Sequence, residues 1–161
     1  MVTTLQIETN IANRFSAYAR QKGIDMSILL SDMLNSMIKL DSENSTKISN
    51  LKNQIIEFSN LDVDWDGYGA SKINRKAISN SISIADRMGN VDLDNVDFMP
   101  SHNGAVLFKL KVKNSVVSGE IGDVSMSYFV RIPGEETEYH NFEAIDKTNV
   151  NLLIRKMEGI C

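Results

Sequence analysis

The segment richest in side chains that could do chemistry is LDVDWDGYGASKIN, residues 61–74. It carries three alternating aspartates, two glycines and the only tryptophan: Asp62, Asp64, Asp66, Gly67, Gly69 and Trp65. Carboxylates in a loop suit a hard divalent cation, but an EF-hand closes with a glutamate that this segment lacks. A phosphate-binding loop needs more glycines and a lysine beside a helix start, and Lys72 alone gives little support. We therefore interpret the segment as a structural loop, with Trp65 and Tyr68 anchored on the core and both glycines at positive φ.

The two histidines are the next residues that could take part in catalysis. Neither His102 nor His140 has a recognisable serine or cysteine nucleophile or a second histidine at metal-ligand spacing. Four glutamates lie close to His140 in the sequence: Glu135, Glu136, Glu138 and Glu143. A carboxylate beside a histidine can form an acid–base pair, but that requires a geometry that the sequence does not give. We predict no catalytic residues, no metal site, no cofactor and no enzymatic activity.

A third polar set opens the chain. Thr4, Gln6 and Glu8 alternate with Leu5 and Ile7. Side chains alternate between the two faces of a strand, so this pattern predicts a short strand with one polar and one apolar face. One strand cannot form a sheet alone.

Two helical patterns follow this strand. The first has an apolar stripe that Gly23 ends, and Asp25 is the predicted N-cap of the second. The stripes contain Ile11, Phe15, Tyr18 and Ala19 in the first helix, and Leu29, Leu30, Met33, Leu34, Met37 and Ile38 in the second. Two short helices cannot bury both stripes by themselves. The simplest partner for this segment is a second copy of the same segment.

Residues 1–40 resemble the ribbon–helix–helix family of DNA-binding dimers. The resemblance rests on the alternating strand, the helix lengths and the turn Gly23-Ile24-Asp25-Met26-Ser27, which matches the family's glycine, capping and serine positions. It implies an intertwined homodimer whose strands pair into an antiparallel ribbon. Such a ribbon enters the major groove of double-stranded operator DNA.

The resemblance also implies the DNA-binding residues. Thr4, Gln6 and Glu8 would face the bases, and the Gln6 amide can donate and accept as a bidentate contact with adenine requires. Glu8 could accept from a cytosine amino group but would repel the phosphate backbone. The backbone amides of Met26 and Ser27 would hold a phosphate. The alternative for Thr4 and Gln6 is an ordinary solvated strand face.

The rest of the chain predicts a second domain. Residues 41–47, DSENSTK, are polar without apolar periodicity, so we predict a helix end and a linker there, with Ser45 or Thr46 capping the next helix. Residues 48–161 predict an α+β domain, an antiparallel meander flanked by helices. Its predicted helices are 48–60, 73–88 and 149–157, and its predicted strands are 105–113, 116–121, 124–132 and 137–144. Lys109, Lys111 and Lys113 share one strand face, which we interpret as solvated rather than as a nucleic-acid surface.

Composition and charge limit the function classes. The sole cysteine, Cys161, allows no disulfide within the chain and no cysteine-based metal site. No apolar run reaches the ~18 residues of a membrane span, and the N-terminus has no apolar signal core, so we expect a cytoplasmic protein. Residues 1–40 carry four basic and three acidic side chains, net +1, and the other 121 residues carry 13 and 18, net −5. Nucleic-acid binders usually show a clearer basic patch.

These features predict a cytoplasmic DNA-binding repressor that acts as a homodimer. Ribbon–helix–helix proteins with a C-terminal extension are often antitoxins that bind their own operator with the N-terminus and a toxin with the rest. The predicted function is therefore an autoregulating antitoxin. Two alternatives are a stand-alone regulator with a C-terminal sensing or partner-binding domain, and an enzyme or accessory protein that uses the N-terminus only to dimerise. The WDGYGA string of residues 65–70 resembles one found in uncharacterised bacterial proteins and names no activity.

Overall fold

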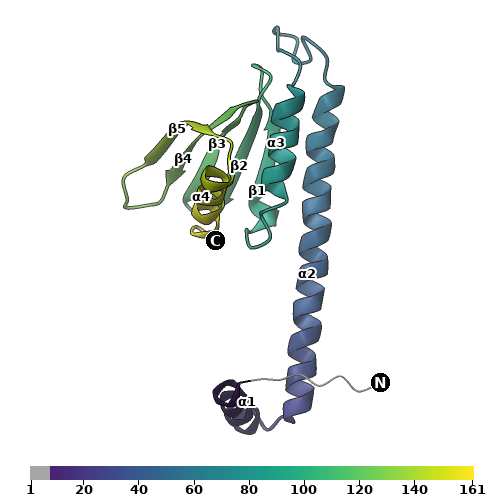
Figure 1. The fold of residues 1–161 in the computed structure, drawn as a ribbon, viewed down its shortest axis with the longest axis vertical. Coiled ribbons are helices and arrows are strands. Elements are labelled where there is room, and N and C mark those ends of the chain that lie inside the picture. The colour runs from purple at the N-terminus through teal and green to yellow at the C-terminus, as the bar shows by residue number, and fades with distance from the viewer. Residues whose placement is uncertain (1–7) are drawn as a thin grey trace. The chain divides into compact units, whose positions relative to one another are not determined.

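The computed structural model describes residues 8–161, and the chain divides into two compact units, Met1–Glu43 and Asn44–Cys161 (Figure 1). Each unit is described by itself. The predicted N-terminal strand falls on residues that lie outside the described part, except for Glu8. The first described helix is α1, Thr9–Lys22, and the second is α2, Met26–Glu57, which starts in the first unit and ends in the second.

The turn between α1 and α2 forms as the sequence predicts. Gly23 lies in the left-handed region at φ 66°, where glycine carries no Cβ penalty. Its amide donates to the Arg20 carbonyl, and the Ile24 amide donates to the Ala19 carbonyl. Asp25 then caps α2, because its carboxylate accepts from the Ser27 amide at 2.8 Å and from the Ser27 hydroxyl. The predicted helix stop and the predicted cap are confirmed.

The predicted helix end near Leu40 is wrong, because α2 is continuous through residues 41–47. This polar stretch contains neither glycine nor proline, so nothing in it forces the helix to stop. Ser45 and Thr46 are interior helical residues rather than caps. The Lys39 ammonium lies 3.6 Å from the Glu43 carboxylate one turn away, a pairing that supports the helix. Helix α2 ends at Glu57 and is followed by a single 3₁₀ turn, η1, Phe58–Asn60, so the helical segment ends near residue 60 as predicted, although the 3₁₀ turn itself was not predicted.

The second unit contains a five-stranded antiparallel sheet in the order β1-β2-β3-β4-β5, which confirms the α+β class and the meander. The strands are β1 Val96–Pro100, β2 Val106–Val112, β3 Ser115–Ile121, β4 Ser125–Arg131 and β5 Glu138–Ala144. Strand β1, which follows the 3₁₀ turn η2, Leu93–Asn95, is missing from the sequence prediction. It is an edge strand that ends at Pro100, where a residue without an amide hydrogen is tolerated.

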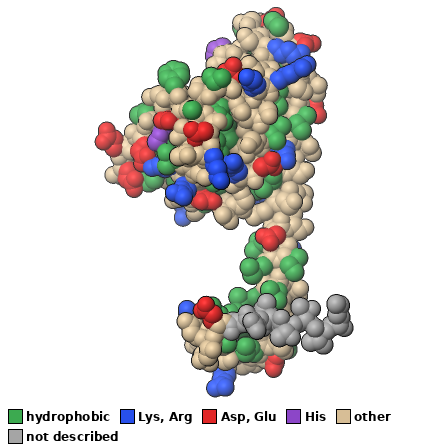
Figure 2. All heavy atoms as spheres, in the orientation of Figure 1, with side chains coloured by type: hydrophobic (Ala, Val, Ile, Leu, Met, Phe, Trp, Pro, Cys, Tyr) green, Lys and Arg blue, Asp and Glu red, His purple; other side chains and the backbone are tan. Residues whose placement is uncertain are grey.

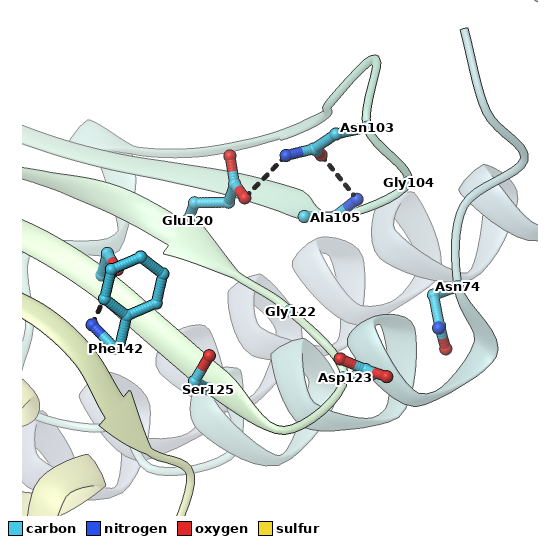
Figure 3. Close-up of a pocket in the computed structure, with 10 residues that line it drawn as sticks. Asn74, Asn103, Gly104, Ala105, Glu120, Gly122, Asp123, Ser125 and Phe142 are labelled. Atoms are coloured by element: carbon cyan, nitrogen blue, oxygen red, sulfur yellow. Dashed lines mark hydrogen bonds between the residues drawn. The ribbon is translucent and has the colours of Figure 1, made fainter.

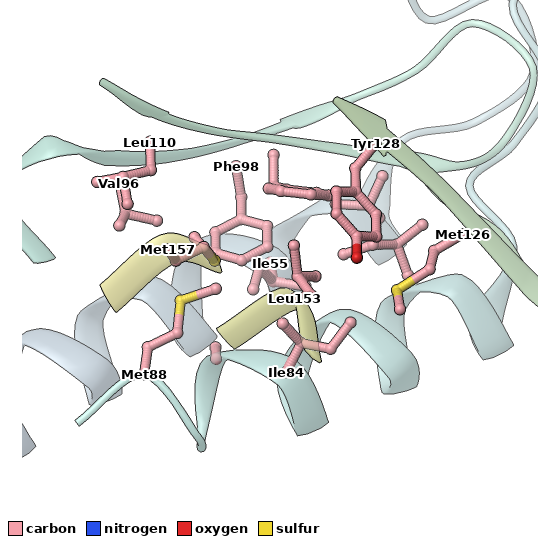
Figure 4. Close-up of a cluster of buried hydrophobic side chains, with 14 of the residues drawn as sticks. Ile55, Ile84, Met88, Val96, Phe98, Leu110, Met126, Tyr128, Leu153 and Met157 are labelled. Atoms are coloured by element: carbon pink, nitrogen blue, oxygen red, sulfur yellow. The ribbon is translucent and has the colours of Figure 1, made fainter. Parts of the chain in front are cut away.

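One face of this sheet is covered by helices (Figure 1). These are α3, Arg75–Ala85, capped by Asn74, and α4, Lys147–Glu158, capped by Asp146. The C-terminal part of α2 contributes Ile55 to the same core. The largest fully buried side chains of this core are Phe98, Phe108, Ile55, Ile84, Met88, Leu110, Ile121, Met126, Leu153 and Met157. Figure 4 shows part of this core. Within residues 8–161 no helix has the length and apolarity that crossing a membrane requires.

The opposite face of the sheet carries the predicted lysine row in part. Lys109 and Lys111 alternate with the buried Phe108 and Leu110 along β2, as a strand with one solvated face requires. Lys113 lies beyond the strand, in the β2–β3 turn, with a positive φ of 54°. The row therefore contains two strand residues rather than three.

Candidate functional site

The described part of the first unit leaves most of its apolar side chains exposed and several half-buried. Among residues 8–43, Ala19 is the one buried residue. Figure 2 shows apolar side chains on the surface of α1 and of the N-terminal part of α2. The exposed large ones are Ile11, Tyr18, Ile24, Ile28, Met33, Leu34, Met37, Ile38 and Leu40. Contiguous exposed apolar surface is typical of sites where proteins interact.

Part of this surface forms a groove of about 880 Å³ between α1 and α2 within the first unit. Its lining is Ile11, Arg14, Phe15, Ala17, Tyr18, Gln21, Leu29 and Met33. Ile11, Phe15 and Tyr18 belong to the predicted stripe of the first helix, and Leu29 and Met33 belong to that of the second. The two predicted stripes therefore meet in one groove.

The predicted base-contacting residues fall mostly outside the described chain. Thr4 and Gln6 lie among residues 1–7. Glu8 is exposed, has an extended backbone at φ −56° and ψ 138°, and directly precedes α1. Its carbonyl accepts from the Ala12 amide at 3.0 Å, whereas its side chain does not cap the helix.

The predicted phosphate-holding amides lie at the start of α2, on Met26 and Ser27. The Ser27 amide already donates to the Asp25 carboxylate. Hydrogen bonds from the Ser27 hydroxyl and from the amides of Ser27 and Ile28 hold the pKa of Asp25 below its usual range. The Asp25 carboxylate therefore carries a negative charge where a phosphate would sit, so a phosphate there would have to displace this cap.

Three of the four basic groups of the first unit lie on α1, and the fourth, Lys39, lies on α2 and pairs with Glu43. Arg14, Arg20 and Lys22 are all exposed. The Lys22 ammonium lies 5.9 Å from the centre of the Tyr18 ring, within the range of a cation–π contact. These three exposed side chains are the cations of α1 that could contact phosphate.

The aspartates of the WDGYGA region are used by the loop itself. Asp66 accepts from the amides of Tyr68 at 2.8 Å and Ala70 at 3.1 Å, and these bonds lower the pKa of its carboxyl. Asp64 accepts from the Gly69 amide at 2.6 Å, and Asp62 pairs with Lys72 at 3.0 Å. Within residues 8–161, no three histidine, cysteine or acidic side chains gather as a metal site would require. These contacts favour the structural interpretation of the loop.

The anchoring of this loop differs from the prediction. Trp65 is half-buried and its indole N–H donates to the Ser71 carbonyl at 3.2 Å. Tyr68 is 94% exposed, so the prediction that it anchors the loop on the core is wrong. It lies at the loop tip between Gly67 and Gly69, whose φ values of 74° and 88° confirm the predicted positive φ.

The segment that follows the loop supports a neighbouring turn. The Ser71 amide donates to the His102 carbonyl and the Asn74 amide to the Gly104 carbonyl, both at 2.8 Å. A Cβ on Gly104 would come within 2.9 Å of the Lys72 carbonyl oxygen. This close approach explains a glycine at position 104. The contact between two segments distant in sequence was not predicted.

The second histidine lies in a small titratable cluster between β4, β5 and α4. The His140 ring stacks on Tyr128, with ring centres 4.4 Å apart and planes 10° from parallel. Its Nε2 lies 3.5 Å from Glu138 and its Nδ1 4.0 Å from Glu143, and Glu138 also pairs with Lys156 at 2.6 Å. Burial, with a smaller effect of the two carboxylates, raises the pKa of Tyr128 to about 12.

This cluster contains no serine, threonine or cysteine among its members. Two of the four glutamates considered with His140, Glu135 and Glu136, lie exposed in the β4–β5 turn and outside the cluster. Buried Tyr128 has no hydrogen-bond partner for its hydroxyl within the described chain. The stacking, the ion pairs and the burial are those of a packing contact that fastens β5 to α4.

Comparison of the chain with known protein families, with curated proteins and with solved structures gave no match. The functional conclusion therefore rests on the residues and geometry of this chain.

Proposed function

We propose that this protein is a DNA-binding transcriptional regulator that acts as a homodimer through its first unit. The observation that carries the proposal is the uncovered apolar surface of α1 and α2. Within residues 8–43 only Ala19 is buried, while Met33, Leu34, Met37 and Ile38 are exposed along α2. Burying such side chains yields about 1.5–3 kcal/mol each, which gives a strong drive to associate.

The occupant of this surface that we propose is a second copy of the same segment. Each copy offers the same groove between α1 and α2 and the same stripe along α2, so a twofold arrangement can bury both. The turn supports this arrangement, because Gly23 and Asp25 fix the end of α1 and the start of α2. The DNA-reading part of the proposal comes from the resemblance to ribbon–helix–helix dimers, in which a pair of strands would contact the bases through Gln6 and Thr4.

The second unit supports a regulator with a sensing or partner-binding domain. It has a continuous core of its own, to which strands β1 to β4 and helices α3 and α4 all contribute buried side chains. A folded domain of this kind suits recognition of a ligand or protein better than an extension that folds only on its target. A toxin partner is the second candidate, because the net charge of −5 over residues 41–161 suits a basic protein.

The test is a binding titration with the DNA upstream of the gene and a scrambled control, at two salt concentrations. We expect the protein to bind the native DNA more tightly than the scrambled control. If Arg14 or Arg20 contacts a phosphate, its replacement by alanine should make the affinity depend less steeply on salt concentration. Gln6→Ala should weaken binding by about 1–3 kcal/mol for each adenine that the glutamine amide reads, and it should relax the sequence preference. Asn53→Ala, on an exposed position of α2 in the second unit, is the control and should bind as the natural chain does.

Two outcomes would contradict the proposal. Equal binding of both DNAs would leave a dimer without sequence recognition, and absence of binding to either would make the first unit a dimerisation device alone. The antitoxin function would be favoured if the protein prefers the native DNA and if the product of an adjacent gene also co-purifies with it by binding the second unit.

A further inference from the structure

The two edge strands of the sheet, β1 and β5, differ in what lies beside them. At β1, the side-chain amide of Gln54 on α2 donates to the Phe98 carbonyl at 3.0 Å, and the strand ends at Pro100, which has no amide hydrogen to offer. At the opposite side of the sheet, β5 pairs with β4 alone among the described residues (Figure 1). The outer edge of β5 is therefore open to a further strand.

Strand β5 is held in place from its inner side. The His140 ring stacks on Tyr128 of β4, with ring centres 4.4 Å apart, and Glu138 pairs with Lys156 of α4 at 2.6 Å. A strand that is already ordered loses little conformational freedom when another strand is added to it. The open edge is therefore organised before any partner binds.

An irregularity limits the length of this edge. The β4–β5 register shifts after His140, and Phe142 has a positive φ of 56° with its amide donating to the Ser127 hydroxyl at 3.0 Å (Figure 3). A bulge bends an edge strand and interrupts its pairing. An added strand can therefore pair regularly only with the first half of β5, around Glu138–His140. So short a ladder needs further contacts to bind a partner.

An exposed aromatic side chain lies on the regular half of the edge strand. Tyr139 is 70% exposed, and its ring centre lies 6.3 Å from that of Phe129 on the neighbouring strand. Cross-strand contacts with aromatic side chains stabilise strand pairing, and an added strand would place its own side chains beside this ring. Tyr139 therefore offers an apolar contact next to the open backbone.

The charge around β5 indicates the chemistry of the partner. Residues 132–146 contain five carboxylates and no lysine or arginine: Glu135, Glu136, Glu138, Glu143 and Asp146. Residues 41–161 carry 18 acidic and 13 basic side chains, so without these five the two numbers are equal. Figure 2 shows acidic side chains gathered on the side of the second unit where β5 lies. The acidic excess of this unit is thus concentrated on one edge strand and its flanking turns, which attract a basic partner.

We propose that the outer edge of β5 binds an extended, lysine- or arginine-rich segment of a partner protein as a sixth strand. Backbone hydrogen bonds along the first half of β5 hold the segment, Tyr139 contacts its apolar side chains, and the carboxylates attract its cations. A second copy of this chain does not fit, because its own β5 would bring the same carboxylates against each other. The proposal rests on the partner-binding role proposed for the second unit and not on DNA binding.

The test uses the full chain without DNA and three probes. The first is an end-blocked peptide of four Lys-Val repeats, the second is its Glu-Val counterpart, and the third is spermine, which has the same positive charge as the first and no peptide backbone. Calorimetry should show binding of the Lys-Val peptide that weakens as salt is added, and no binding of the Glu-Val peptide. Hydrogen exchange followed by NMR should show that the Lys-Val peptide protects backbone amides within residues 138–141, whereas spermine protects none.

Two pairs of variants locate the site. Glu135→Gln combined with Glu136→Gln removes two exposed carboxylates beside β5 and should weaken binding of the Lys-Val peptide about fivefold or more. Asp41→Asn combined with Glu57→Gln removes two exposed carboxylates on α2 and should leave the affinity unchanged.

The second pair compares exposed aromatic residues. Tyr139→Ser should weaken binding of the Lys-Val peptide, whereas Tyr68→Ser, at the tip of the WDGYGA loop, should not.

Four outcomes would overturn the proposal: no binding of the Lys-Val peptide, equal binding of the Glu-Val peptide, equal amide protection by spermine, or equal losses of affinity in the two double variants. None of these outcomes bears on the titration with upstream DNA, so the two proposals can fail separately.

Discussion

Gly119 in the middle of β3 shows how tightly single residues are fitted in this sheet. A Cβ at this position would lie 2.2 Å from the Ser127 carbonyl oxygen and 2.5 Å from the Tyr128 Cβ, so the strands would have to separate. We expect Gly119→Ala to lower the free energy of unfolding by about 3 kcal/mol or more. Gly89→Ala is the control, because a Cβ there meets nothing within 4 Å. Urea denaturation of both variants checks this, and equal stability of the two would contradict it.

The loop at Trp65 permits a second comparison at the residue scale. Trp65 is half-buried and donates to the Ser71 carbonyl, whereas Tyr68 is almost fully exposed. Trp65→Ala should therefore cost about 1–3 kcal/mol of stability, less than the ~3–5 kcal/mol of a fully buried aromatic. Tyr68→Ala should change stability by less than about 0.5 kcal/mol. Thermal melts of the two variants measure this, and a large destabilisation in Tyr68→Ala would show a burial that the structure lacks.

Asp25 gives a pH dependence with a definite sign. Hydrogen bonds from Ser27 and Ile28 lower its folded-state pKa. Because the folded-state pKa is lowered, ionised Asp25 stabilises the start of the helix at any pH above its unfolded-state pKa of ~3.9. This stabilisation is lost as the pH falls through the folded-state pKa. The Ser27 amide resonance should titrate below that unfolded value. Asp25→Asn should keep the cap and abolish the titration, whereas Asp25→Ala should lose both. A Ser27 resonance that titrates in Asp25→Asn would contradict the assignment.

At the scale of elements, the continuous α2 is the clearest departure from the sequence prediction. Ser45 is an exposed interior residue of this helix, in the segment predicted as a linker. Proline there removes a backbone hydrogen bond and clashes with the preceding turn, so Ser45→Pro should cost about 3 kcal/mol. Ser45→Ala should be neutral or slightly stabilising. Circular dichroism during urea denaturation measures the stability of both variants. If Ser45→Pro were as stable as Ser45→Ala, residues 41–47 would be a linker rather than part of a continuous helix.

The sequence predicts elements where a local pattern decides them. Phe108 and Leu110 alternate with Lys109 in β2, and Gly23 and Asp25 mark a helix end and a helix start, so these features could be predicted. The structure of residues 41–47 could not be predicted from the sequence, because polar residues without glycine or proline allow either a helix or a linker. Strand β1 is short and ends at a proline, so its alternation gives a weak signal in the sequence, and it is recognised by its antiparallel pairing with β2.

A polar pocket of about 290 Å³ in the second unit (Figure 3) could not be predicted in the same way. Asn74, Asn103, Glu120 and Phe142 come from four separate parts of the chain. The strand register and the hydrogen bond from the Asn74 amide to the Gly104 carbonyl bring these parts to one pocket. The positive φ of Phe142 arises at the register shift between β4 and β5, and no local pattern in the sequence indicates it. Conversely, the aspartates of residues 62–66 look like a candidate metal site in the sequence, but in the structure they form hydrogen bonds and an ion pair within their own loop.

At the scale of the whole molecule, the two units differ in how they obtain their stability. The second unit buries its own core, so the fragment of residues 44–161 should fold alone and remain monomeric. Its unfolding should be cooperative by circular dichroism, and its mass by light scattering should not depend on concentration. Aggregation or absence of a cooperative transition would show that the fragment needs residues 1–43 to fold.

The first unit lacks such a core in its described residues, so the full chain should be a dimer of twice the 18.0 kDa chain mass at micromolar concentration.

A charge introduced into the groove tests which surface makes the dimer. Met33 lines the groove of the first unit and is 44% exposed, whereas Met99 lies on the sheet of the second unit and is 41% exposed. Met33→Asp should give a monomer that no longer binds the upstream DNA, because an unpaired carboxylate cannot be buried in an apolar interface without a large cost. Met99→Asp introduces the same charge at a similar exposure and should leave both the dimer and DNA binding intact. Light scattering and DNA titration of the two variants decide the matter: a dimeric Met33→Asp would place the interface elsewhere, and a monomeric Met99→Asp would place it on the sheet.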